Sequence, residues 1–231
     1  VAAAAAATGA HQLQIDHATV HGTPTGDPIS PFAPALVAFF TYFFVYLLTG
    51  VSFLRERTGG TLERLMATPV EQVEIVTGYT VGFAVFAVLQ VAILMLWVLG
   101  TIHIPSLGPL PEIAIGLGVP SAGSAVVAFL VVLVLAMGAV SLGIFLSTFA
   151  RTELQVIQFI PVVLVPQFLL SGVLFPVTSL PSVVQPFVQL VPLSYAVNAL
   201  RHVFIAGAGL ESSAIQVDLL VLAGFAVFFG L

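Results

Sequence analysis

Two apolar runs, each long enough to cross a lipid bilayer as a helix, flank one charged segment and constrain this chain most strongly. The runs are Pro34–Leu54 and Ile75–Leu99, and the segment between them is Arg55–Glu74 (RERTGGTLERLMATPVEQVE). A helix needs roughly 20 apolar residues to span the hydrocarbon core. The segment holds three of the five basic and four of the ten acidic residues of a chain that is 59% hydrophobic and only 6% charged. We therefore predict an integral membrane protein in which this segment leaves the bilayer before the chain returns to it.

The charged segment carries the signals of a folded element. Gly59-Gly60 predicts a break after the first apolar run, because glycine adopts conformations that end helices. Thr61 is a suitable N-cap for the helix that follows. The apolar residues of that helix share one face by their i, i+3 and i+4 spacing: Leu62, Leu65 and Met66. We expect a short amphipathic helix at the membrane surface, suited to docking a soluble partner. A plain solvated loop is the alternative.

Two further motifs predict where later helices begin. In Thr68-Pro69-Val70-Glu71, a threonine N-cap, a proline at the first helical position and a capping-box carboxylate would start the second crossing. Thr152 and Gln155 repeat the capping-box spacing and would start the fourth crossing. Pro161 and Pro166 should kink that helix, which a helical bundle tolerates.

We predict an all-α, polytopic membrane helical bundle with five membrane segments. We interpret the chain as a fragment of a protein with six. The crossings are expected at residues 34–54, 73–99, 121–149, 154–174 and 215–231. Residues 1–33 lack a helical period and are expected to form an extracytoplasmic loop or tail. Residues 55–72 form the charged elbow. Residues 175–209, rich in proline, are expected to form an outer re-entrant hairpin with helical pieces at 182–190 and 194–206.

The arginines agree with this map. Arg55, Arg57 and Arg64 share one side of the membrane, and Arg151 returns to that side two crossings later. Arg201 alone falls on the opposite side. Because basic residues are enriched in cytoplasmic loops, the elbow and the Arg151 turn are expected to face the cytoplasm.

Composition excludes several kinds of chemistry. The chain has no cysteine, which excludes disulfides, thiolate nucleophiles and cysteine-ligated zinc. It has no lysine, and therefore no Walker A loop to bind nucleotide phosphates. Five scattered arginines do not form a nucleic-acid groove. No catalytic triad, zinc-helix motif or intramembrane aspartate pair is present, so we predict a protein that is not an enzyme. If it uses ATP, another chain binds it.

The titratable side chains outside the elbow give weak signals. Four near the start of the chain have spacings that match no standard metal motif, and solvated loop residues are the favoured interpretation: His11, Asp16, His17 and His21. Asp218, just inside the last crossing, is the best candidate for ion coupling, although the outer boundary lies within its reach. Since no carboxylate is predicted at mid-membrane, a proton- or sodium-driven carrier is disfavoured.

Neutral polar and small residues within the crossings suggest helix contacts. Hydrogen bonding between helices is the default role of four side chains, and lining a substrate path is the alternative: Gln90, Gln158, Gln167 and Asn198. Small residues that would allow close packing are Gly78-x-x-x-Gly82 on the second crossing and Ala139, Gly143 and Ser147 on the third.

Two stretches resemble one known family. FLRERTGGTLERLMATPVEQVEIVTGY (Phe53–Tyr79) resembles the cytoplasmic segment of type-2 ABC transporter permeases, and Leu169–Phe204 is similar to that family's second signature. The residues that match the second signature, at the expected outer hairpin, are Ser171, Gly172, Phe175, Pro176, Pro181, Pro192, Tyr195 and Arg201. The resemblance covers about residues 34–231, which would form the transmembrane domain. It is closest to bacterial drug or daunorubicin-resistance-type efflux permeases.

The resemblance implies a permease of the cell membrane that dimerises, as a homo- or heterodimer, and pairs with ATP-binding cassette subunits on the cytoplasmic face. ATP and magnesium would be bound there, and this chain would hold no cofactor or metal. A coupling helix would correspond to Thr61–Ala67. The residues expected to contact the ATPase are Arg55, Glu56, Arg57, Gly59, Gly60, Thr61, Leu62, Glu63, Arg64, Leu65 and Met66.

The expected function is therefore the membrane subunit of an ATP-driven exporter that moves a hydrophobic or amphipathic substrate such as a drug. Export of polysaccharide, lipid or heme by the same architecture is the first alternative. A non-transporting membrane anchor that only recruits a cytoplasmic ATPase is the second. A stand-alone carrier or an intramembrane enzyme is less favoured than either.

Overall fold

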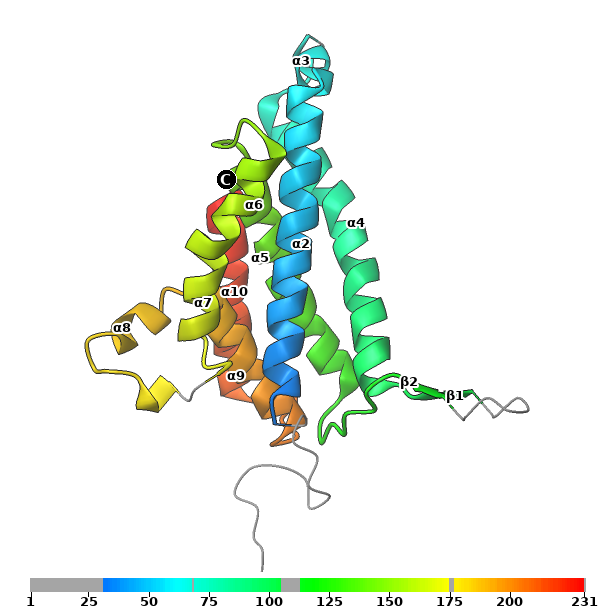
Figure 1. The fold of residues 1–231 in the computed structure, drawn as a ribbon, viewed down its shortest axis with the longest axis vertical. Coiled ribbons are helices and arrows are strands. Elements are labelled where there is room, and N and C mark those ends of the chain that lie inside the picture. Colours follow the sequence, from blue (N-terminus) through cyan, green and yellow to red (C-terminus); the bar gives the residue numbers. More distant parts are fainter. Residues whose placement is uncertain (1–30, 68, 105–112, 175–176, 231) are drawn as a thin grey trace, which may run out of the picture.

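The computed structural model describes residues 31–67, 69–104, 113–174 and 177–230. The predicted tail up to residue 30, with its histidines, lies outside these residues, as do Thr68, Phe175 and Pro176. The described elements are almost all helical, which confirms the predicted all-α bundle (Figure 1). The long helices are α2 (Ala33–Thr58), α4 (Gln72–Leu99), α5 (Ala125–Ser147) and α10 (Ser213–Gly230). The shorter helices are α3 (Thr61–Met66), α6 (Glu153–Phe159), α7 (Val165–Leu170), α8 (Gln185–Val188) and α9 (Pro192–Phe204).

Within the described residues, five helical stretches are long and apolar enough to cross a membrane. These stretches are Ala33–Thr58, Val73–Leu99, Ala125–Ser147, Glu153–Leu170 and Ser213–Gly230. The number agrees with the five segments expected from the sequence. The helices run roughly side by side, with α3 at one end of the bundle and α9 at the other (Figure 1).

Helix α5 forms the centre of the bundle. It packs against α2, α10, α4 and α9, and it is apolar all around rather than along one stripe. A helix with no polar face is expected to be surrounded by other helices. Val131, Val132 and Ala136 on α5 are fully buried, which agrees with this expectation.

Small residues bring α2 and α5 into close contact. A Cβ atom added at Gly143 on α5 would lie 3.1 Å from the carbonyl oxygen of Tyr46 on α2. A Cβ atom added at Gly50 on α2 would lie 2.9 Å from Cγ1 of Val156. Gly143 therefore has the packing role predicted for it.

The predicted packing role of Gly78-x-x-x-Gly82 is wrong for contacts within this chain. A Cβ atom added at either glycine would meet no atom within 4 Å among the described residues. Both glycines are exposed on α4, and no other helix packs directly against them. Small residues four positions apart allow a second helix to pack closely, but they do not by themselves bring one to this face.

The first crossing is longer than predicted, because α2 continues to Thr58 rather than ending at Leu54. Arg55, Glu56 and Arg57 are therefore helical and not part of a loop. Basic residues in the last turn of a helix are favourable, since they complement the partial negative charge of its carbonyl end.

The fourth crossing is interrupted, as its prolines predicted. Between α6 and α7 lies a π-helical turn, η1 (Ile160–Leu164), in which Val165 N donates to Ile160 O. Pro161 lies inside this turn and Pro166 follows it. Proline lacks an N–H donor, so a regular α-helical ladder cannot continue through it.

The segment after residue 174 contains short helices, but their bounds differ from the prediction. A single 3₁₀ turn, η2 (Val177–Ser179), precedes α8, and α9 begins at Pro192 rather than at Ser194. Proline is favoured at the first position of a helix, which explains the earlier start. The Ser194 hydroxyl instead donates to the carbonyl oxygens of Val188 and Val191, at 2.8 and 2.6 Å.

A small antiparallel hairpin follows α4, between the second and third crossings. It consists of β1 (Ile102–Ile104) and β2 (Ile113–Ile115), in the register Ile102 to Ile115. It projects away from the helices near the end of the bundle opposite to α3 (Figure 1).

Candidate functional site

Helix α3 lies at the tip of the bundle, and two glycines separate it from α2. Gly59 is the C-cap of α2, and its N–H donates the last bond of the helical ladder to Arg55 O at 2.8 Å. Gly60 has a φ of 75°, a left-handed conformation that favours glycine, and it is the N-cap of α3. The break predicted at these glycines is therefore present. The predicted N-cap at Thr61 is wrong, since Thr61 is already the first helical residue.

Helix α4 begins with a capping box formed by Glu71 and Glu74, and not at Thr68 as predicted. Glu71 is the N-cap, and its carboxylate and that of Glu74 satisfy backbone N–H groups reciprocally. The Glu71 N–H donates to Glu74 Oε2 at 3.1 Å. Glu71 thus has a capping role, but as the N-cap itself, and Pro69 precedes the helix. The reciprocal bonds between Glu71 and Glu74 satisfy the first N–H groups of the helix, which explains a start after the predicted one.

Arg57 ties the end of α2 to the end of α5. Its guanidinium donates to the carbonyl oxygens of Ser147 at 3.0 Å, Thr148 at 2.6 Å and Ala150 at 3.3 Å. The last carbonyl groups of a helix have no partner within the helix. Arg57 supplies these donors and places a positive charge at the negative end of α5.

Arg55 ties the same end of α2 to the start of α6. Its Nε and Nη2 atoms donate to Oε1 and Oε2 of Glu153, at 2.7 and 2.9 Å. Glu153 is the first residue of α6 and follows the N-cap Thr152, whose hydroxyl accepts from Gln155 N at 3.4 Å. Thr152 therefore caps α6 as predicted. The Gln155 side chain accepts from Arg151 N rather than from Thr152 N.

Buried contacts extend this connection. Tyr46 on α2 donates its hydroxyl to Val156 O on α6 at 3.2 Å. Leu54, Ala150 and Val156 form a small buried cluster between the three segments. We call the end of α2, the end of α5 and the start of α6 the α2–α5–α6 junction. Its hydrogen bonds, ion pair and apolar contacts join α2 to the α5–α6 turn, and α3 follows α2 directly.

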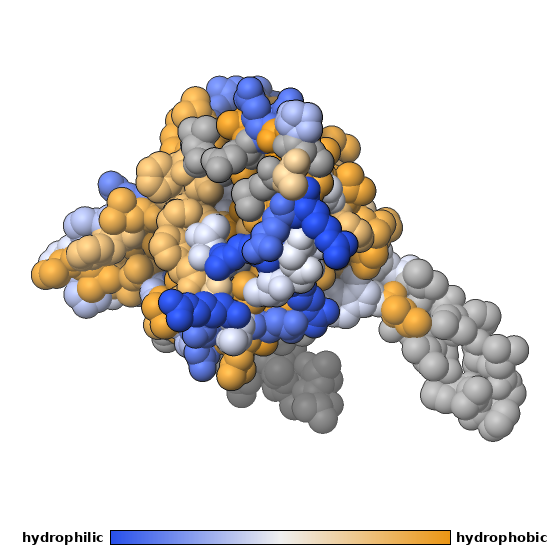
Figure 2. Space-filling model, turned by 90° about the horizontal axis from the view of Figure 1, so that it is seen from above, coloured by the Kyte–Doolittle hydropathy of each residue, from blue (hydrophilic) through white to orange (hydrophobic). Residues whose placement is uncertain are grey.

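The α3 end of the bundle is the charged end. Figure 2, a view from that end, shows hydrophilic side chains gathered there, with apolar ones along the margins. Thr61, Glu63 and Arg64 on α3 are exposed, whereas Leu62 is half-buried. The contact between Arg55 and Glu153 places the elbow and the Arg151 turn at this same end, as the arginine pattern predicted. Arg201 lies in α9, at the opposite end (Figure 1).

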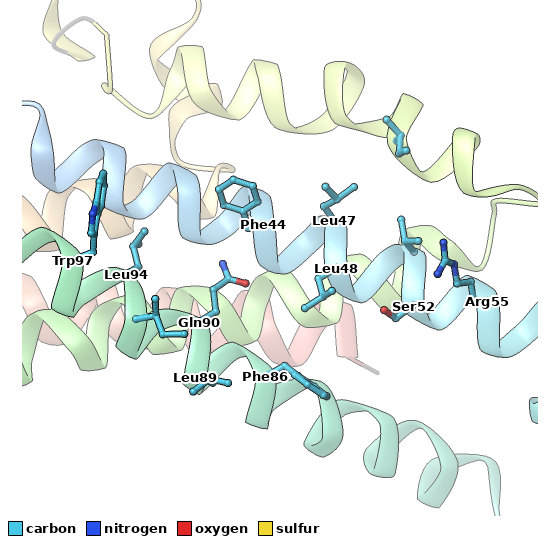
Figure 3. A pocket seen from close by; sticks show the side chains of 13 residues that line it. Phe44, Leu47, Leu48, Ser52, Arg55, Phe86, Leu89, Gln90, Leu94 and Trp97 are labelled. Atoms are coloured by element: carbon cyan, nitrogen blue, oxygen red, sulfur yellow. The ribbon is translucent and has the colours of Figure 1, made fainter. Parts of the chain in front are cut away.

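Of the four neutral polar residues predicted to bond helices or line a path, Gln90 lines a cavity. The cavity has a volume of about 810 Å³ and lies between α2 and α4, with Ile157 of α6 at its margin. Figure 3 shows the Gln90 side chain between the two helices, with Arg55 at one end of the cavity and Trp97 at the other. Its other walls are mainly leucine, isoleucine and phenylalanine side chains. Ligand pockets of this size and polarity are typical for small organic molecules.

The other three polar residues lie elsewhere. Gln158 is exposed on α6. In the described part of the chain, Gln167 Oε1 has no hydrogen-bond partner, and neither has the buried Tyr42 hydroxyl. Asn198 on α9 donates to Asp218 Oδ2 on α10 at 2.8 Å, and the Asp218 side chain is buried. Asn198 thus forms a hydrogen bond between two helices, which is the first of the two roles predicted for it. No spacing in the sequence indicates that Asn198 and Asp218, 20 positions apart, would pair.

The second signature motif organises the end opposite to α3. Arg201 donates to Gly172 O at 2.6 Å, and Gly172 has a φ of 78°. Burial lowers the pKa of the Arg201 guanidinium from its usual value. The Ser171 hydroxyl donates to Phe168 O at 3.0 Å, and the Tyr195 hydroxyl donates to Gln189 O at 2.9 Å. Arg201 and Tyr195 therefore hold the turns around α9, and the carbonyl of Pro181 accepts the first bonds of the α8 turn.

Metal binding has no support in the part of the chain that the structure describes. No three histidine, aspartate or glutamate side chains there are close enough together to hold an ion.

Comparison with known proteins assigns the family. The family model described as ABC-2 type transporter matches residues 12–205. The chain belongs to the ABC-2 type transporter family. Its five candidate spans make it a multi-pass membrane protein, as the sequence predicted.

Several curated proteins are relatives of this ABC-2 type transporter chain. It is 32% identical over 211 residues to ABC transporter G family member 20 of Dictyostelium discoideum, covering 91% of the chain and 27% of that protein. It is 32% identical over 167 residues to the inner membrane transport permease YhhJ of Escherichia coli K12, covering 71% and 40%. It is 25% identical over 181 residues to the probable multidrug ABC transporter permease YbhR of the same strain, covering 77% and 44%.

The ABC-2 type transporter chain thus spans less than half the length of each of these relatives. No solved structure shows a significant match to it.

Proposed function

We propose that this chain is the membrane-spanning subunit of an ATP-driven exporter that moves hydrophobic or amphipathic molecules such as drugs. The family is a transporter family, and relatives carry the names transport permease and probable multidrug permease. These 231 residues contain no lysine and so hold no Walker A motif, and we assign ATP and magnesium binding to an ATP-binding cassette partner.

The observation that carries this proposal is the placement of α3. It is a short helix with an exposed charged face, fixed at the tip of the bundle by the glycine break before it and the capping box after it. The ATP-binding subunit would dock on this face from the cytoplasm. The α2–α5–α6 junction would then carry a displacement of α3 into the bundle, because Arg57 and Arg55 connect α2 to the α5–α6 turn.

The π-helical turn Ile160–Leu164 supports the same mechanism. It separates the start of α6, which belongs to the junction, from α7, which leads to the opposite end of the bundle. Interrupted helical turns often mark hinges. A tilt of the junction would bend the fourth crossing at this turn and change the shape of the cavity between α2 and α4. A second copy of the chain would complete the transport path.

The cavity favours small apolar substrates over sugar polymers. Its walls offer Gln90, Ser52 and Arg55 among mostly apolar side chains, whereas a polysaccharide needs many polar partners for its hydroxyl groups. This contrast makes a drug-like substrate the preferred class.

The test is reconstitution of the chain in lipid vesicles with and without its ATP-binding subunit. We expect substrate transport only with that subunit and ATP, and a rate of ATP hydrolysis that rises when substrate is added. Arg64→Glu on the exposed face of α3 should abolish the rise, while the control Glu211→Lys, on an exposed loop residue, should not. An ATPase that binds without responding to substrate would indicate an anchor, and transport without ATP would indicate a carrier. Either result contradicts the proposal.

A further inference from the structure

A second cavity lies between α2 and α4 at the α3 end of the bundle. It has a volume of about 570 Å³ and is lined by residues of α2, α3 and α4 and by Val70, which lies between α3 and α4. Ser52 and Phe86 line both cavities, so the two are contiguous. Figure 3 shows Ser52 beside Arg55, at the end of the larger cavity away from Trp97. Together the cavities form a groove along α2 and α4, from α3 towards Trp97.

The walls of the second cavity suit a flat or aromatic molecule. Tyr79, Phe83 and Phe86 present aromatic rings to it. Gly78 and Gly82 form part of its floor, and a Cβ atom at either position would meet nothing within 4 Å. The cavity exists at this point because neither glycine has a side chain and no neighbouring residue fills the space.

The charge of this cavity is negative. Glu56 and Glu74 line it, and no arginine does. Among the described residues, Arg55 forms an ion pair with Glu153, whereas Glu56 and Glu74 form no ion pair. Glu56 interacts with the neutral hydroxyl of Tyr79, which leaves its charge uncompensated. The Glu74 carboxylate accepts one bond from Glu71 N, and a carboxylate has room for several more. The charge of Arg55 beside the neighbouring cavity is already matched by Glu153.

We propose that this groove binds lipophilic organic cations, with the cationic group between Glu56 and Glu74 and the apolar part extending past Phe86 into the larger cavity. Carboxylates attract a cation, and aromatic faces stabilise it further. The apolar walls exclude a small hydrated ion, which has no apolar surface to bury. As a statement about transport substrates, this inference rests on the exporter function proposed above, whereas binding itself requires no ATP.

The test is binding of tetraphenylphosphonium to the purified chain in nanodiscs of neutral lipid, without ATP or ATPase. We expect saturable binding of this cation that depends on the protein. We expect no protein-dependent binding of tetraphenylborate, an anion of the same shape. The variant Glu56→Gln/Glu74→Gln should bind the cation about tenfold more weakly, since each lost charge contact is worth about 0.5–1 kcal/mol. The control Glu211→Gln removes a carboxylate outside the groove and should bind as the parent does.

A second variant tests the groove without changing charge. Gly82→Leu should fill the cavity and weaken cation binding, while Gly224→Leu, which also meets no neighbour, should leave it unchanged. Equal binding of the cation by the parent and the double glutamine variant would overturn the proposal. So would efficient crosslinking of a Gly82→Cys variant to a second copy, because a helix would then occupy the groove. Binding of the cation without export by the chain and its ATP-binding subunit would support the cation site and contradict the proposed exporter function.

Discussion

Arg55 and Glu153 are 98 positions apart in the sequence, yet their side chains meet in a two-point ion pair. Arg55 Nε lies 2.7 Å from Glu153 Oε1, and Nη2 lies 2.9 Å from Oε2. The pair joins the last turn of α2, which leads directly into α3, to the first residue of α6. In the mechanism proposed above, a displacement of α3 would act on α2 and, through this pair and Arg57, on the α5–α6 turn.

The ion pair should contribute little to stability and more to coupling. Both side chains are exposed, at 67% and 47%, and exposed pairs are worth about 0–1 kcal/mol. Glu153→Arg should therefore lower the thermal unfolding temperature only slightly but reduce the substrate-stimulated rate of ATP hydrolysis. The charge-swapped variant Arg55→Glu/Glu153→Arg should recover that rate. If the swap is as poor as the single variant, the pair does not act as a link.

Arg57 should matter more for stability than Arg55. Arg57→Gln removes donors from three carbonyl groups at the end of α5, at 2.6–3.3 Å, and unsatisfied groups of this kind cost about 1–3 kcal/mol. We expect a clear loss of thermal stability in detergent. Arg151→Gln is the matched control, since it removes an arginine at the same end whose side chain makes none of these bonds. Equal stability of the two variants would show that Arg57 does not stabilise the junction.

The contact between Gly50 and Val156 can be tested by a double-mutant cycle. Gly50→Ala places a Cβ atom 2.9 Å from Val156 Cγ1, and overpacking of this kind costs about 1–3 kcal/mol. Val156→Ala removes that methyl group and should make the second substitution tolerable. We therefore expect the double variant to be more stable than the sum of the single effects predicts, as measured by thermal unfolding. Additive losses would mean that α2 and α6 are not in contact at this position.

The pair of Asn198 and Asp218 should stabilise the contact between α9 and α10. Asn198→Leu leaves the carboxylate of Asp218, only 5% exposed, without its donor at 2.8 Å, and this should cost about 1–3 kcal/mol. Asp218→Asn keeps a hydrogen-bonding side chain of the same size and should cost less. The order of the two unfolding temperatures checks this prediction, and the reverse order contradicts it.

Features set by local sequence were predictable. The glycine break at Gly59-Gly60, the N-cap at Thr152 and the interrupted fourth crossing follow from the conformational preferences of glycine, threonine and proline. The start of α4 was predicted too early, because Glu71, which is not a favoured N-cap residue, caps the helix together with Glu74. The predicted end of the first crossing at residue 54 is wrong, because α2 continues through its charged residues to Thr58, where the arginines find partners on α5 and α6.

Contacts between distant residues could not be predicted from the sequence. Nothing near Arg57 indicates that it meets carbonyl groups 90 or more positions away. Similarly, Gly78 and Gly82 have the spacing of a packing motif, yet within this chain they form part of the floor of a cavity. Both outcomes depend on how the helices are arranged around α5.

The side of the membrane on which α3 lies tests the central claim most directly. The chain has no cysteine, so Glu63→Cys on the exposed face of α3 and Ser182→Cys before α8 each introduce a single thiol. We predict that a membrane-impermeant maleimide labels the Ser182→Cys variant in intact cells and the Glu63→Cys variant only in inverted vesicles. Labelling of the Glu63→Cys variant in intact cells would place α3 outside, where no ATP-binding subunit can reach it, and would contradict the account.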